Sequence, residues 1–184
     1  MNLLSSTSIF SFFTLISRIL GYLRDILLAF FLGASIFAYA FFVAFRLPNT
    51  FRRLFAEGTF NAAFIPSYTS AKLENKKKGK KFADDILGSL LIILTLIVTV
   101  VEIFTPYLVY LIAPGFVEND VKFNLAVELT RITFPFLLFV SLSSFFSGIL
   151  NSNNKFAAAA AAPIILNIIL ILSLIISYKL NLNI

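Results

Sequence analysis

Three formal charges lie inside the first apolar segment of the chain, within residues 17–25 (SRILGYLRD). The surrounding hydrophobic stretch begins near Ile9 and continues to Leu32. An Arg or Asp at the centre of a bilayer costs roughly 2.5–3.5 kcal/mol on insertion scales. We therefore expect these charges to face other protein or a water-filled cavity, and the rest of the chain to form the wall of that cavity.

The composition indicates a polytopic membrane protein. Of the 184 residues, 59% are hydrophobic and only 13% are charged, whereas a soluble domain carries about a quarter charged residues. No signal-peptide pattern is present, so the first apolar run is expected to stay as a membrane span. The chain contains no Cys and no His, which excludes disulfides and imidazole catalysis. With no Gly-rich phosphate loop or metal-ligand spacing either, we do not expect an enzyme.

The apolar runs predict an all-α transmembrane bundle of about five spans. Several exceed the roughly 18 residues that mark a spanning helix. The expected spans cover residues 5–32, 37–70, 82–112, 123–150 and 156–178. The second is too long for one straight crossing, and Pro48 is expected to kink it. We expect residues 1–184 to form one helical unit, because the sequence shows no internal repeat and no separate soluble domain.

Charged loops predict the orientation in the membrane. The loop 71–81 carries six Lys and one Glu, so the positive-inside rule places it in the cytoplasm. Counting crossings then puts the N-terminus in the cytoplasm, the mildly acidic loop 116–122 outside and Lys155 inside. An alternative interpretation takes 26–45 as a single span and leaves residues 1–17 at the membrane interface.

The first two spans hold an excess of basic side chains. Their charged residues are Arg18, Arg24, Asp25, Arg46, Arg52, Arg53 and Glu57. Arg18 and Asp25 are seven positions apart and share a helix face. Because the planar Arg fork binds phosphate bidentately, a basic cavity in the membrane points to an anionic, phosphate-bearing ligand. The alternatives are that these charges only pair with one another, or that Arg52 and Arg53 snorkel to a membrane surface.

Polar residues in the later spans have structural explanations. Glu128 and Arg131 are three positions apart and can pair along a helix. A small-residue stripe is explained by close helix packing. Its members are Ser141, Ser143, Ser144, Ser147 and Gly148.

Several of these stretches resemble motifs of the MurJ (MviN) family of lipid II flippases. The two longest are 17–25 (SRILGYLRD) and 40–49 (AFFVAFRLPN), which runs into 52–58 (RRLFAEG). Shorter similarities lie at 113–116 (APGF), 132–135 (ITFP) and 148–151 (GILN). The resemblance extends from Ser5 to about Ile171.

The resemblance implies a transporter of the multidrug/oligosaccharidyl-lipid/polysaccharide exporter superfamily. Such proteins have two six-helix lobes around a cationic cavity. They move the undecaprenyl-diphosphate-linked peptidoglycan precursor, lipid II, to the outer leaflet by alternating access. The resemblance assigns substrate binding to Arg18, Arg24, Arg52 and Arg53, and gating or coupling to Ser17, Asp25, Asn49 and Glu57.

It also implies a role in peptidoglycan biosynthesis, cell wall biogenesis and cell shape, in the bacterial cytoplasmic (inner) membrane. Expected partners are lipid II, membrane lipids, the second lobe and cell-wall synthesis proteins, but no nucleic acid. No cofactor or metal is expected, and the membrane potential or an ion gradient would drive transport.

The chain departs from the family in two ways. Tyr39 stands where many members have Asp, and only the N-terminal lobe is matched. Two alternatives therefore stay open: a related exporter of a drug or another polyprenyl-linked saccharide, and a non-transporting membrane scaffold of the same fold.

Overall fold

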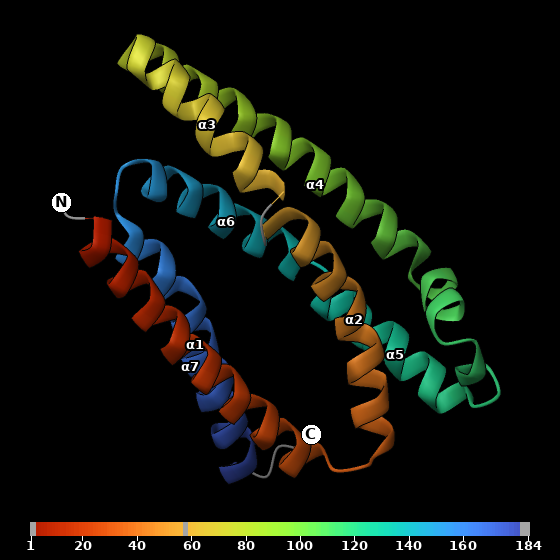
Figure 1. Cartoon of the computed structure of the whole chain (residues 1–184). Coiled ribbons are helices and arrows are strands. Elements are labelled where there is room, and N and C mark those ends of the chain that lie inside the picture. The colour runs from red at the N-terminus through yellow and green to blue at the C-terminus, as the bar shows by residue number, and fades with distance from the viewer. Residues whose placement is uncertain (1–2, 57–58, 181–184) are drawn as a thin grey trace.

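Helices packed largely in pairs make up the described part of the chain (Figure 1). The computed structural model describes residues 3–56 and 59–180, and all regular structure in those ranges is helical. The helices are α1 (Leu3–Leu32), α2 (Ile36–Ala56), α3 (Thr59–Glu74), α4 (Lys76–Ile112), the 3-10 helix η1 (Pro114–Phe116), α5 (Asp120–Thr133), α6 (Phe136–Ser152) and α7 (Phe156–Lys179). The predicted all-α class is confirmed.

Three of the described helical stretches are long and apolar enough to cross a membrane. They are Lys76–Ile112, Asp120–Ser152 and Phe156–Lys179, which correspond to α4, to α5 together with α6, and to α7. The range 37–70, expected as one kinked span, is divided between α2 and α3. Both helices contain a proline, Pro48 in α2 and Pro66 in α3.

A glycine ends the first helix. Gly33 has a φ of 56° and donates its N–H to the carbonyl of Ala29 at 3.0 Å. This left-handed conformation suits glycine, which has no Cβ to clash with the preceding turn. The chain then turns through Ser35, whose hydroxyl accepts the N–H of Ala38 at 3.2 Å. Because this break falls inside 26–45, the structure is incompatible with one continuous span over those residues.

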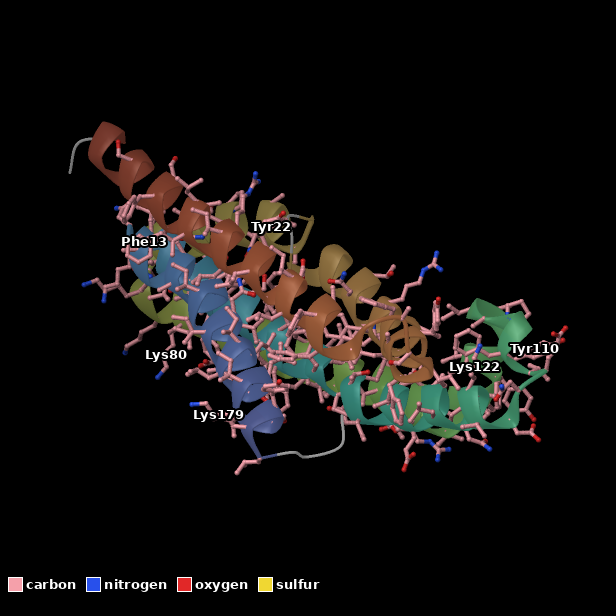
Figure 2. All side chains as sticks on the ribbon, turned by 90° about the horizontal axis from the view of Figure 1, so that it is seen from below. Phe13, Tyr22, Lys80, Tyr110, Lys122 and Lys179 are labelled. Carbon is pink, nitrogen blue, oxygen red and sulfur yellow. The ribbon has the colours of Figure 1, made fainter. Side chains whose placement is uncertain are left out.

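The helix α4 is longer than the bilayer core is thick. Its 37 residues extend about 55 Å at roughly 1.5 Å per residue, against about 30 Å of hydrocarbon. The basic residues at its start can therefore lie outside the hydrocarbon, and the Asn75 side chain caps this end by accepting the N–H of Lys77 at 2.8 Å. Figure 2 shows Lys80 far from Tyr110 and Lys122, which lie together at the opposite end of the molecule.

The helix α6 joins the helix pairs to one another. α1 packs chiefly on α7, α2 on α5 and α3 on α4, whereas α6 contacts α2, α3 and α7. Figure 1 shows α1 and α7 side by side. The helices α3 and α4 form a second pair, and α6 lies between the two pairs. The arrangement leaves α1 attached to the rest mainly through α7.

Aromatic side chains fill the core between α3, α4 and α6. Phe64 stacks on Phe60 and Tyr68 with ring centroids 5.3 and 5.5 Å apart, and it meets Phe145 of α6 at 5.0 Å. Leu94 of α4 is completely buried in the same cluster. Burial of aromatic and aliphatic groups at this density gives the α3–α4–α6 unit a rigid interior.

The helices α3 and α4 cross at a glycine. A Cβ on Gly79 would lie 2.8 Å from the Cα of Lys72 and 3.2 Å from its backbone nitrogen. Backbone atoms cannot move aside as a flexible side chain can, so only glycine allows this approach.

We predict that Gly79→Ala lowers the free energy of unfolding by about 1–3 kcal/mol, the usual cost of overpacking. Gly88→Ala is the matched control on the same helix, because nothing lies within 4 Å of the position of its Cβ. Thermal unfolding of the purified protein in detergent measures both. Equal melting temperatures for the two variants would show that the crossing is not tight.

Candidate functional site

Residues of two helices hold the guanidinium of Arg24. Its Nε and Nη2 donate to Oδ1 of the adjacent Asp25 at 3.0 and 2.7 Å, and its Nη1 donates to Oδ1 of Asn167 on α7 at 3.0 Å. The Arg24 side chain is 24% exposed and that of Asp25 is 62% exposed. These three hydrogen bonds use three of the five N–H donors of the guanidinium. Arg24 therefore keeps donors for a ligand while its position is fixed.

Asn167 is the residue that links α1 to α7. It is 6% exposed, and its Nδ2 donates to the backbone carbonyl of Ser17 at 3.0 Å while its Oδ1 accepts from Arg24. A Cβ on Gly21 would lie 3.6 Å from Nδ2, at ordinary van der Waals distance, so Gly21 lies directly against the amide between the helices. Asn167 was not among the residues predicted from the sequence, although an amide in the middle of an apolar span is itself a signal of an interhelical hydrogen bond.

The other expected site residues lie on α1 and α2 or outside the described residues. Arg18 is exposed on α1, and Asn49 is half-buried on α2. The positions of Arg52 and Arg53 fall in α2, but their side chains are not among the described ones. Glu57 lies outside the described residues altogether. The structure thus unites Ser17, Arg24 and Asp25 through Asn167.

A cavity of about 480 Å³ lies beside this cluster. Residues of α1, α3, α6 and α7 line it, and its polar lining consists of Thr14, Ser17, Asn61, Ser143, Ser144, Ser147 and Asn151. None of the described lining residues is charged. This cavity inside the lobe therefore differs from the cationic cavity that the resemblance implies between two lobes.

The small-residue stripe on α6 has two faces. Ser141, Ser144 and Gly148 are buried, and a Cβ on Gly148 would lie 2.6 Å from Oδ1 of Asn61. Close packing explains this face, as expected. Ser143 and Ser147 line the cavity, and Ser144 also reaches it from the buried face.

The expected pairing of Glu128 with Arg131 is not found among the described residues. Both side chains are exposed, and Arg131 interacts electrostatically with Glu102 of α4 instead. The spacing along α5 permitted a local pair, but the neighbouring helix offers a second carboxylate. In the described part of the chain, no cluster of three or more acidic side chains could hold a metal ion.

The family model described as "Lipid II flippase MurJ" matches residues 28–181. The chain belongs to the MurJ family. It is 47% identical over 163 residues to a probable lipid II flippase MurJ of Rhizobium tropici, covering 88% of this chain and 31% of that protein. It is 39% identical over 169 residues to the lipid II flippase MurJ of Burkholderia cenocepacia, covering 91% of this chain and 33% of the relative.

A solved structure shows the same fold. The chain matches a lipid II flippase MurJ in an inward closed conformation with a TM-score of 0.77 and 32% identity, covering 94% of this chain and 36% of that one. The chain thus spans about a third of the length of the MurJ proteins that it matches. The family resemblance predicted from the sequence motifs is confirmed.

Tyr39, the position where many MurJ proteins are expected to have Asp, has a cationic neighbour here. The Nζ of Lys122 on α5 lies 5.7 Å from the centroid of the Tyr39 ring. A cation over an aromatic face at this distance is attracted by the ring quadrupole. Here the positive charge faces an aromatic ring and not a carboxylate.

We predict that Asn167 and Arg24 are energetically coupled. In a double-mutant cycle of Asn167→Ala and Arg24→Ala, we expect a coupling free energy of about 1 kcal/mol, because one charge-assisted hydrogen bond joins them. Unfolding of the purified protein in detergent measures it. The control cycle pairs Asn167→Ala with Lys179→Ala, twelve positions along α7, where additivity is expected. Additivity in both cycles would contradict the proposed link.

Proposed function

We propose that this chain forms the N-terminal lobe of a flippase that moves lipid II from the inner to the outer leaflet of the bacterial cytoplasmic membrane. Family membership supports this proposal, together with the lipid II flippase names of its relatives. The rest of the transporter would supply the opposite wall of a central cationic cavity. Alternating access would then expose that cavity to each leaflet in turn.

The observation that carries the proposal is the fixed position of Arg24. Its guanidinium lies on α1 with spare N–H donors, held by Asp25 and Asn167. Arg binds diphosphate oxygens in a fork geometry. A guanidinium that is already oriented loses less entropy on binding, which favours affinity. Arg18, on the same helix, and Arg52 and Arg53 of α2 would add positive charge for the same diphosphate.

Asp25 would act as the exchangeable partner in this site. It is more exposed than Arg24, and its carboxylate occupies two of the Arg24 nitrogen atoms. An incoming diphosphate would compete with this carboxylate. Substrate binding would thereby change the contacts of α1, which is how Asp25 could take part in gating together with Ser17, Asn49 and Glu57. Membrane potential or an ion gradient would reset the transporter.

Two other functions can be distinguished from lipid II flipping by experiment. An exporter of another polyprenyl-linked saccharide would use the same diphosphate contacts and differ only in the sugar it accepts. A non-transporting scaffold would have no need of an oriented arginine. Reconstitution of the intact protein in liposomes with labelled lipid II separates the three.

We predict that Arg24→Ala abolishes complementation of a flippase-depleted strain and lowers lipid II flipping in liposomes at least tenfold. Arg24→Lys should recover little activity, because an ammonium lacks the fork. Lys80→Ala is the control, since Lys80 is exposed on α4. Normal growth with membrane-inserted Arg24→Ala protein would refute the substrate-binding role.

We also predict the orientation of the lobe. Because this chain contains no Cys, single substitutions can report on each side of the membrane. Lys77→Cys should react with an impermeant maleimide only after the cells are opened, and Glu118→Cys should react in intact cells. The reverse pattern would place the N-terminus outside.

A further inference from the structure

Four exposed lysine side chains at the start of α4 form no ion pair with any residue that the structure describes. These four residues, the α4 lysine cluster, are Lys76, Lys77, Lys80 and Lys81. Two other lysines nearby are engaged, since Lys78 pairs with Glu74 and Lys72 donates to Oδ1 of Asn153. A group of ammonium ions that the lobe itself does not neutralise is suited to an anionic partner.

The α4 lysine cluster lies at the level of lipid headgroups. From Ile86 onward α4 is predominantly apolar, and Lys81 precedes Ile86 by about 7.5 Å at roughly 1.5 Å per residue. At the other end of the helix, Tyr107 and Tyr110 are exposed, as aromatic residues at a membrane interface are. The distance along α4 from Lys81 to Tyr107 is about 39 Å, close to the roughly 40–45 Å of a bilayer with its headgroups. The lysines therefore lie beside one leaflet and the tyrosines beside the other.

The lipid-facing side of α4 continues into the cluster. Ile92, Leu96 and Ile103 are exposed and share one face of the helix at about 3.6 residues per turn. Lys81 is about three turns before Ile92, so it lies on that face too. A lysine stem can lie along apolar surface while its ammonium reaches polar surroundings. Phospholipids that cover Ile92 therefore have their headgroups near the cluster.

Two carboxylates next to the cluster reduce its charge without cancelling it. Asp84 and Asp85 are exposed one turn closer to the apolar part of α4, and neither pairs with a lysine in the described ranges. Within residues 74–85 the exposed lysines outnumber the carboxylates by two. The field at this end of α4 is therefore positive, and it attracts the anionic lipids of a neighbouring leaflet.

We propose that the α4 lysine cluster binds the headgroups of anionic phospholipids in the leaflet beside it, which the predicted orientation makes the cytoplasmic leaflet. Clusters of about four to eight basic residues next to a membrane span are typical of such recognition. The contact fixes the depth of the α3–α4 pair in the membrane. It goes beyond the proposed function and does not depend on it, because the partner is a bulk lipid and not the transported one.

The test measures which phospholipid lies against each end of α4. Residues 1–184 contain no Trp, so in a background free of other tryptophans one substitution provides a single fluorophore. Ile92→Trp reports on the leaflet beside the lysines, and Ile103→Trp, about three turns further on the same face, reports on the other leaflet. The purified protein is reconstituted in mixtures of phosphatidylcholine and phosphatidylglycerol. One lipid at a time carries brominated acyl chains, which quench tryptophan, and the quenching gives the relative affinity of the two lipids at each position.

We expect phosphatidylglycerol to be preferred at least about fivefold in the Ile92→Trp protein, since one lysine near an anionic surface contributes about that much. In the Ile103→Trp protein we expect the two lipids to bind within twofold of each other. Combining Lys77→Gln, Lys80→Gln and Lys81→Gln should reduce the preference in the Ile92→Trp protein to less than twofold.

Two further variants of the Ile92→Trp protein complete the test. Asp84→Asn with Asp85→Asn should strengthen the preference for phosphatidylglycerol, because it removes negative charge beside the cluster. Lys179→Gln, an exposed position at the end of α7, is the control and should leave the preference unchanged. Equal binding of both lipids in the Ile92→Trp protein, an equal preference at both reporter positions, or a preference that survives the three lysine substitutions would overturn the lipid site. If the triple variant is not monodisperse, the two aspartate substitutions decide, and an unchanged preference then rejects the proposal.

Discussion

The hydrogen bonds of Asn167 connect α1 to the rest of the lobe. Inside a membrane an unsatisfied amide or guanidinium costs several kcal/mol, so Arg24 and Asn167 each need the other. Their pairing also fixes the register of α1 on α7, because Ser17 and Arg24 are bound by the two ends of one amide. The same polar groups that make α1 unfavourable in lipid thus hold it in a single register on α7.

The helix α6 packs on its neighbours with one face and lines the cavity with another. Its buried face packs on the aromatic cluster around Phe64, where Gly148 allows close contact. Its other face supplies Ser143, Ser147 and Asn151 to the cavity. Residues of small volume serve both faces, by admitting a neighbouring helix on one and leaving space on the other.

The sequence was sufficient to predict the all-α class, the membrane character and the family. These three predictions follow from local features of the sequence: the long apolar runs, helix breaks such as Gly33, and the family motif that contains Arg24. Interhelical partners could not be predicted, because contacts such as that between Arg24 and Asn167 depend on how distant helices pack. The Glu128–Arg131 pair failed for the same reason, since Glu102 of α4 is near Arg131.

The contact between Lys122 and Tyr39 shows how two helices can attract each other with a single formal charge between them. The quadrupole of the tyrosine ring comes from its π electrons and draws the ammonium toward the ring face. The attraction depends on the ammonium being over that face. The junction of α2 and α5 is therefore sensitive to the orientation of one aromatic ring, and not only to the presence of opposite charges.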